Sequence, residues 1–393
     1  MPADSQPKRS TPWWNNARHR AVIFQLFLAL ALLLFFFFIG RNTLHNLEQR
    51  GIATGLAFLR QKAGFGIIQH LIPYNENYTY GRTFVVGLLN TILVSGLGII
   101  FASILGFTMG VARLSSNWLI SRLAAVYIET FRNIPLLLQI FFWYFAVLRA
   151  LPAPRQSLHI GQAAFLNIRG LYLPRPVFEA GFGWVAAALL FCLLFLPALY
   201  YWAKKRQERT GEQFPVLIVS LALVTGLPTI AYFGAGTPLG WDLPVLKGFN
   251  FRGGLTIIPE LTALLMALTI YTATFIAEIV RSGILSVSHG QTEAASALGL
   301  RPGKVLRLVV IPQAMRVIIP QLTSQYLNLT KNSSLATAIG YPDLVAVFAG
   351  TTLNQTGQAM EIIAMTMAVY LTISLLISLF MNWYNSRSMI KER

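Results

Sequence analysis

The sequence has little of the chemistry on which soluble enzymes depend. Only 11% of its 393 residues are charged and 55% are hydrophobic, whereas about 25% charged residues is typical of soluble domains. The single cysteine, Cys192, excludes an internal disulfide and is expected to pack as a small hydrophobe, because it lies inside an apolar run. The five histidines are scattered in or beside predicted loops without metal-ligand spacing, so no metal site is predicted.

Motifs for nucleotide binding and catalysis are also absent. The string GLRPGK at residues 299–304 comes nearest to a phosphate-binding loop. Its glycines are one residue too close together, and Val305 stands where a hydroxyl must hold magnesium. No Ser-His-Asp arrangement lies on a recognisable nucleophile elbow. The chain is therefore not predicted to bind ATP, to hold a cofactor or to be an enzyme.

Acidic residues are scarce, with 14 Asp and Glu against 31 Lys and Arg and a formal net charge of +17. A protein that binds nucleic acid usually gathers such charge on one soluble face. Here most Lys and Arg stand in the gaps between apolar runs, which is the pattern that orients membrane proteins. Membrane lipid is therefore the expected surrounding, and nucleic acid is not an expected partner.

Long apolar runs dominate the chain, and about eight of them are read as membrane spans, each needing roughly 20 apolar residues. They cover residues 21–39, 84–109, 123–148, 183–202, 215–233, 261–280, 317–329 and 360–381. The first is too long for the core of a signal peptide and lacks a small-x-small cleavage site. Basic residues outside the first and last spans, including Lys8 and Arg393, predict that both termini are cytoplasmic. The predicted fold class is an all-α integral membrane protein.

The third span carries ionisable residues, which are costly at membrane depth unless they are paired or face water. Glu129 and Arg132 have the i,i+3 spacing that allows an ion pair on one helix face. Pro135 removes the backbone bond to the Phe131 carbonyl and predicts a kink. Two interpretations stay open: a structural salt bridge, or, together with Asn133, one wall of a solute pathway.

Two further polar positions stand out beside apolar spans. Glu278 and Arg281 repeat the i,i+3 spacing near the expected cytoplasmic end of a span, which favours an interfacial pair over substrate contact. Lys331, Asn332 and Ser333 fall at an expected helix break near membrane depth. Backbone groups freed at such a break can bind small polar solutes where they line a cavity.

The segment from residue 152 to 252 interrupts this pattern of spans. Its two apolar runs are separated by the basic string KKRQER at residues 204–209, which places that connector in the cytoplasm and predicts an inserted helical hairpin. The following external segment, residues 234–254, is rich in Gly, Pro and aromatic residues, and irregular backbone is expected there.

A polar island at residues 289–312, HGQTEAASALGLRPGKVLRLVVIP, lies between two spans. Its alanines favour a short helix that Gly299 would end in a left-handed conformation. Pro302 pushes Arg301 towards extended backbone and suits the first turn of a second helix. The Ala-rich sides would allow another protein to approach closely, so this segment is predicted to be a docking element.

The same segment resembles the permease subunits of ATP-binding-cassette (ABC) importers, whose signature joins a Glu-Ala-Ala triplet, a nearby Gly and an aliphatic-x-aliphatic-Pro close. The matching residues are Glu293, Ala294, Ala295, Gly299, Val309, Ile311 and Pro312, with Val309 where Ile is usual. The resemblance implies a coupling helix that fits a cleft on a separate ATPase subunit. The residues predicted to couple to the ATPase are Glu293, Ala294, Ala295, Gly299, Pro302 and Pro312.

Other strings resemble the polar amino-acid branch of these permeases, namely IETFRNIPLLLQIFFWYF and LTKNSSLATAIG, with Asn332 where Asp is frequent. The insert and the string ARLSSNWL are most similar to the larger permease of the general L-amino-acid transporters. This resemblance implies a type I permease core in the bacterial inner membrane. It also implies four partners: ABC ATPase subunits, a second homologous permease, a periplasmic amino-acid-binding protein and a broad range of L-amino acids.

The predicted organisation has three parts. Residues 1–82 form a cytoplasmic N-terminus, an extra span and a periplasmic loop; residues 83–383 form the permease domain; and residues 384–393 form a cytoplasmic tail. The permease domain contains the insert 152–252 and the coupling loop 289–312. The predicted substrate pathway comprises Glu129, Arg132, Asn133, Lys331, Asn332 and Ser333.

The predicted function is that of a permease subunit in an ATP-driven importer of L-amino acids. Two alternatives stay open at the level of the residues. An ion-gradient-driven secondary transporter would show inverted repeats with paired broken helices, and no convincing repeat is found. A non-transporting membrane scaffold would leave Glu129, Arg132 and the docking segment as packing alone.

Overall fold

The computed structural model describes residues 17–49, 54–161 and 163–388, and these are mostly helical. Seven helices are long and apolar enough to cross a membrane, or up to eight if a broken pair is counted as one span. The broken pair is Trp118–Asn133 with Leu136–Ala150. The predicted all-α membrane fold with about eight spans is confirmed. The N-terminal charges that include Lys8 and the C-terminal Arg393 lie outside the described residues.

The chain divides into two compact units, one formed by Met1–Gly96 with Arg301–Arg393 and the other by Leu97–Leu300. Helix α2 contributes its first part to one unit and its last part to the other. The helices of the first unit, with that first part of α2, are α1 (Ala17–Gln49), η2 (Ala57–Arg60), α2 (Tyr80–Arg113), α9 (Pro302–Val305), η6 (Leu306–Val310), α10 (Ile311–Asn332), η7 (Ser333–Ile339), η8 (Val345–Thr352), α11 (Leu353–Thr356) and α12 (Ala359–Ser388).

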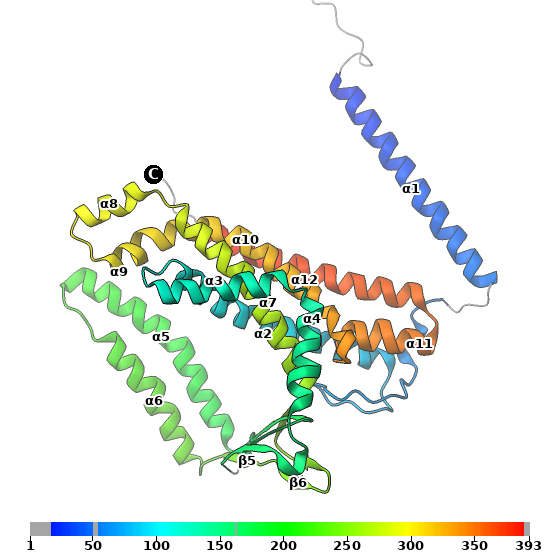
Figure 1. Ribbon diagram of the computed structural model, residues 1–393, viewed down its shortest axis with the longest axis horizontal. Coiled ribbons are helices and arrows are strands. Elements are labelled where there is room, and N and C mark those ends of the chain that lie inside the picture. The colour runs from blue at the N-terminus through cyan, green and yellow to red at the C-terminus, as the bar shows by residue number, and fades with distance from the viewer. Residues whose placement is uncertain (1–16, 50–53, 162, 389–393) are drawn as a thin grey trace, which may run out of the picture. The chain divides into compact units, whose positions relative to one another are not determined.

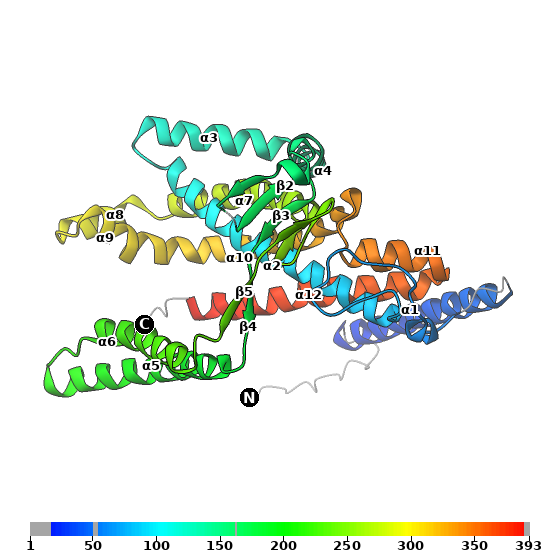
Figure 2. The ribbon, with the colours of Figure 1, turned by 90° about the horizontal axis from the view of Figure 1, so that it is seen from below.

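Helices α10 and α12 pack side by side in the first unit (Figure 2). The face of α10 that includes Ile318, Ile319, Leu322 and Leu329 is buried. A second buried cluster joins Phe58 in η2 to Leu344 and Phe348 near η8. Gly87 of α2 faces this region, since an added Cβ would lie 2.9 Å from the Leu344 Cα.

The second unit contains the rest of α2 and most of the insert. Its helices are α3 (Trp118–Asn133), α4 (Leu136–Phe141), η3 (Phe142–Val147), η4 (Leu148–Ala150), η5 (Pro154–Gln156), α5 (Phe182–Thr210), α6 (Val216–Gly234), α7 (Pro259–Leu285) and α8 (His289–Ala297). Helices α2 and α7 touch through glycine. A Cβ added at Gly106 would lie 2.6 Å from the Ile276 side chain, and one added at Gly110 would lie 2.7 Å from the Ala277 carbonyl oxygen.

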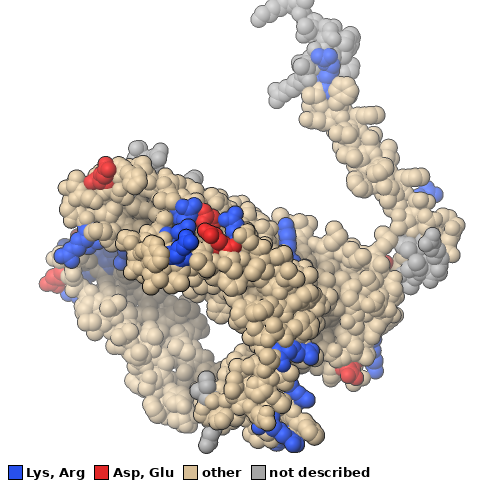
Figure 3. Space-filling view, viewed as in Figure 1, with Lys and Arg blue, Asp and Glu red and all other residues tan. Residues whose placement is uncertain are grey.

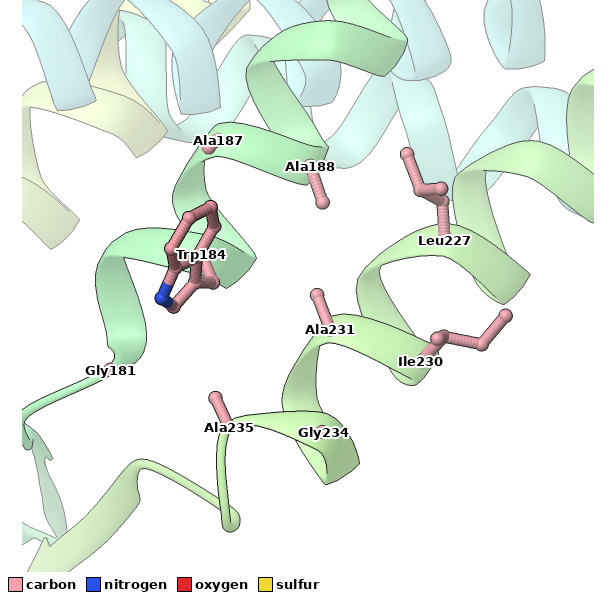
Figure 4. Close-up of a pocket in the computed structure, with 9 residues that line it drawn as sticks. All are labelled: Gly181, Trp184, Ala187, Ala188, Leu227, Ile230, Ala231, Gly234 and Ala235. Atoms are coloured by element: carbon pink, nitrogen blue, oxygen red, sulfur yellow. The ribbon is translucent and has the colours of Figure 1, made fainter.

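The predicted hairpin in the insert is formed by α5 and α6, which run side by side (Figure 1). Cys192 is buried between them, and its thiol donates to the Leu223 carbonyl oxygen at 3.5 Å. A cavity of about 680 Å³ lies near Gly181 at one end of the hairpin, lined by Trp184 and by small or aliphatic residues (Figure 4). No charged or hydroxyl side chain lines this cavity, so it offers no partner to the charged groups of an amino acid.

The expectation of irregular backbone at residues 234–254 is wrong. Short strands occupy this segment and the one before the hairpin: β1 (Leu158–Ile160), β2 (Ala164–Asn167), β3 (Gly170–Leu173), β4 (Arg175–Phe178), β5 (Leu239–Asp242), β6 (Val245–Lys247), β7 (Asn250–Arg252) and β8 (Leu255–Ile257). The sheet orders are β1-β2-β3-β8, β4-β5 and β6-β7, all antiparallel.

The strands were not predicted, and two of their pairings, β3–β8 and β4–β5, join residues far apart in sequence. Arg175 pairs with Asp242, and Leu171 pairs with Ile257, across the whole helical hairpin. Gly253 and Gly254, both with positive φ, provide the turn that local composition marks only as loop. The Gly254 N–H donates to the Asp242 carboxylate at 3.0 Å, which holds that turn against β5.

Candidate functional site

The predicted docking segment begins with α8, a nine-residue helix that starts after Ser288. The Gly299 N–H donates to the Ser296 carbonyl at 2.9 Å, and the Leu300 N–H donates to the Ala295 carbonyl at 3.3 Å. Gly299 has φ of +77°, which L side chains rarely adopt. These bonds form the predicted left-handed helix end with Leu300 just beyond it.

Most of the α8 surface is exposed, as a docking helix requires. Glu293, Ala294 and Ala297 are exposed, whereas Ala295 is buried. Leu298, directly before the glycine, is 82% exposed. Leu298 was not among the predicted coupling residues, because a leucine beside three alanines is typical of a helix. Its exposure in the structure indicates an apolar side chain available to contact a partner protein.

The continuation of the segment is longer than the predicted second helix. Arg301 is extended, with ψ of 149°, and Pro302 occupies the first turn of α9, as predicted. The helix then runs through η6 into α10, where Pro312 again lies in the first turn. Residues Pro302–Ile339 together form one candidate span, so the docking segment leads directly into a membrane helix.

The predicted kink at Pro135 is a sharp break, with α3 and the following helix bent by 103°. The side chain of Gln139 satisfies carbonyls at this break: its Nε2 donates to the Phe131 carbonyl at 2.8 Å and to the Ile134 carbonyl at 3.0 Å. Non-helical backbone at membrane depth is tolerated where such partners exist or where it lines a cavity. The buried amide therefore stabilises the break.

The predicted ion pair between Glu129 and Arg132 does not form. Glu129 instead points to Arg113 of α2, with 3.9 Å between its Oε1 and the arginine Nη2, and the Glu129 side chain is 72% exposed. Arg132 lies over the Phe275 ring of α7, 5.6 Å from its centroid. Acidic and basic side chains gather over α3 (Figure 3). An exposed pair at this distance contributes only about 0–1 kcal/mol, so structural stability does not explain these charges.

Asn133 completes the polar end of α3. Its Nδ2 donates to the Glu129 carbonyl at 2.8 Å, and the side chain is exposed beside the break. Glu129, Arg132 and Asn133 are therefore brought together on one exposed stretch of the second unit. In the same unit Glu278 accepts from Arg281 through both carboxylate oxygens, at 2.6 Å from Nη2 and 3.1 Å from Nε. This short pair within α7 fits the predicted interfacial anchor.

Lys331, Asn332 and Ser333 lie together in the first unit, where α10 ends and the 3₁₀ turn η7 begins. Lys331 is exposed, Asn332 is half-buried and Ser333 is buried, with its hydroxyl donating to the Thr330 carbonyl at 2.7 Å. The expected helix break at these residues is wrong: α10 continues directly into η7, and the chain first leaves helical geometry at Gly340, whose φ is +78°.

A buried polar network beyond this turn was not predicted. Asp343 is fully buried and accepts from the Ala346 N–H at 2.8 Å and from the Tyr370 hydroxyl at 3.3 Å. Asn90 of α2 donates to the Pro342 carbonyl at 2.8 Å, and Thr91 accepts from the Leu344 N–H at 3.0 Å. The network fastens the segment after η7 to α2 and α12. Its two contacts with α2 join residues more than 250 positions apart, so local sequence carries no signal for them.

Several known proteins are similar in sequence to this chain along nearly its whole length. Residues 213–389 match the family described as binding-protein-dependent transport system inner membrane component. The chain is 56% identical over 378 residues to YhdX of Escherichia coli K12, which is named as an amino-acid ABC transporter permease, with 96% of each chain covered.

The names of two further relatives state the range of amino acids that their transport systems carry. The general L-amino acid transport system permease protein AapQ of Rhizobium johnstonii is 49% identical, with 99% of this chain and 98% of AapQ covered. The glutamate/glutamine/aspartate/asparagine transport system permease protein BztB of Rhodobacter capsulatus is 42% identical, with 96% of each chain covered.

Proposed function

Because the chain belongs to the permease family of amino-acid ABC transporters, we propose that it forms, with a second related permease, the path for L-amino acids of broad specificity across the bacterial inner membrane. It is a membrane subunit and not an enzyme, and ATP hydrolysis belongs to a separate ATPase. A periplasmic binding protein delivers the substrate. Neither the secondary transporter nor the scaffold alternative accounts for this family membership.

The observation that carries the proposal is the exposed helix α8 with its left-handed end at Gly299. Glu293, Ala294 and Ala297 present a small, open surface, and Leu298 adds an apolar side chain. Pro302 is the first residue of the candidate span Pro302–Ile339. A displacement of the docking segment would therefore be transmitted directly to a membrane helix. Closure of the ATPase on ATP would thus move the spans without any nucleotide site on this chain.

The proposed orientation follows from counting crossings. If the N-terminus is cytoplasmic, α8 follows the sixth crossing and is cytoplasmic, as contact with an ATPase requires. The basic connector of the α5–α6 hairpin follows the fourth crossing and is also cytoplasmic. The short strands on both sides of the hairpin fall on the periplasmic side, and eight crossings return the C-terminus to the cytoplasm.

The proposed substrate contacts match the chemistry of a zwitterion, whose carboxylate requires a cation and whose ammonium requires a carboxylate or carbonyls. Arg132 and Lys331 are exposed cations, and Glu129 is an exposed carboxylate. Asn133 follows Arg132 in the second unit and Asn332 follows Lys331 in the first, and each adds a neutral donor and acceptor to its own unit. Five of the six are exposed or half-buried and fill no apolar core, which supports a pathway role, whereas Ser333 is buried with its hydroxyl on the Thr330 carbonyl.

Broad specificity is favoured over a preference for acidic amino acids and their amides, because the identity to AapQ exceeds the identity to BztB. Competition for uptake by the reconstituted complex tests this. We expect unlabelled aliphatic, acidic, amide and basic L-amino acids each to compete with labelled glutamate, and the second permease to co-purify. Competition by acidic amino acids and amides alone would contradict the broad range. A complex containing two copies of this chain without another permease would contradict the pairing with a second permease.

A further inference from the structure

A polar stripe runs along the exposed face of α10. Gln321, Ser324, Asn328 and Lys331 are spaced three, four and three residues apart, which places them on one side of a helix. All four side chains are exposed, and none makes a hydrogen bond or ion pair with another residue in the described part of the chain. Lys331 lies ten positions after Gln321, which is about 15 Å at the helical rise of roughly 1.5 Å per residue.

This stripe is not a surface that lipid can cover. It lies within the candidate span Pro302–Ile339, and the opposite face of α10 is buried. Polar side chains have no hydrogen-bonding partners in hydrocarbon, so they are rare there unless they face water or protein.

Helix α12 of the same unit shows what a lipid-facing surface looks like in this chain. Its exposed positions Leu371, Leu375 and Leu379 are spaced by four residues and are all apolar. The chain thus presents two kinds of exposed helix face, one that suits lipid and one that suits water. An interface between tightly packed helices would require partners for every polar group, whereas water satisfies all four side chains at once.

We propose that the stripe of Gln321, Ser324, Asn328 and Lys331 lines the water-filled path and contacts the amino acid as it passes. Lys331 takes the α-carboxylate, and the three neutral side chains contact the ammonium and the side chain. The inference rests on the proposed function and extends it to Gln321, Ser324 and Asn328, which were not among the predicted pathway residues.

The chemistry of the stripe suits substrates of either charge. Asn and Gln amides and the Ser hydroxyl both donate and accept hydrogen bonds, so they bind anionic, neutral and cationic side chains alike. Only Lys331 carries a charge, and it matches the one group that every amino acid offers as an anion. A broad range of amino acids is the expected consequence.

The test uses the complete complex in liposomes with Cys192→Ala, which removes the only cysteine of this chain. Ser324→Cys is compared with Leu375→Cys for its rate of reaction with a charged, water-soluble methanethiosulfonate reagent. We expect Ser324→Cys to react roughly tenfold faster or more, because a thiol in water ionises and one facing lipid does not. Equal, slow reaction of both variants would overturn the proposal.

A second arm tests the role of Lys331. Saturating leucine is expected to slow the labelling of Ser324→Cys, whereas isoamylamine, which lacks the carboxylate, is expected to leave it unchanged. Equal protection by both compounds would overturn the assignment of the carboxylate to Lys331. Labelling does not require ATP-driven uptake, so a fast, protected thiol in a complex that fails to transport would count against the proposed function and not against the stripe.

Discussion

Replacing Leu298 by aspartate is expected to lower ATP-driven uptake by roughly tenfold or more. Leu298 is 82% exposed on α8, and burying a leucine against a partner contributes about 1.5–3 kcal/mol. Since each 1.4 kcal/mol or so changes an equilibrium tenfold, the loss of that contact weakens the ATPase complex by one to two orders of magnitude. Co-purification of the ATPase and uptake by the reconstituted complex both measure the effect.

The matched control is Leu158→Asp, which places the same charge on an exposed leucine of strand β1, away from α8. This variant is expected to retain the ATPase at the level of the unmodified chain. If Leu298→Asp also retained the ATPase and full uptake, α8 would not be the surface that contacts the ATPase.

Replacing Gly110 by alanine is expected to destabilise the subunit by about 1–3 kcal/mol, the range for overpacking a close contact. The added methyl would lie 2.7 Å from the Ala277 carbonyl oxygen and 2.8 Å from the Val280 Cβ, so α2 and α7 must move apart. Loss of the monodisperse species after heating in detergent measures the change.

Gly96→Ala provides the control within the same helix, because a Cβ there meets no atom within 4 Å. Alanine is also the better helix former by about 1 kcal/mol, so this variant is expected to match or exceed the stability of the unmodified chain. Equal losses for both variants would show that the glycines of α2 do not act through contact with α7.

Features set by neighbouring residues were predictable. The left-handed end at Gly299 and the break at Pro135 follow from backbone chemistry that operates within one or two turns. Glycines recur along α2, but a Cβ at Gly87 or Gly106 would meet a neighbouring segment within 3 Å, whereas one at Gly96 would meet no atom within 4 Å. Periodicity finds the spans, whereas only the packed structure shows which glycine is in contact.

Features set by distant residues were not predictable. Glu129 has Arg132 one turn away, yet it pairs with Arg113 across the loop between α2 and α3, because packing on α7 turns Arg132 onto Phe275. The β3–β8 and β4–β5 pairings of the insert and the contacts of the Asp343 network with α2 depend on partners far along the chain. For the same reason, the exposed stripe on α10 emerged only when the buried face of that helix was known.

The most direct test of the account is to ask what drives uptake. Liposomes containing the complex are loaded with ATP, and uptake of labelled amino acid is measured with and without ionophores that remove proton and sodium gradients. The account predicts uptake that requires internal ATP and persists when the gradients are gone. Uptake that continues without ATP or the ATPase subunit, and stops when an ion gradient is removed, would contradict it.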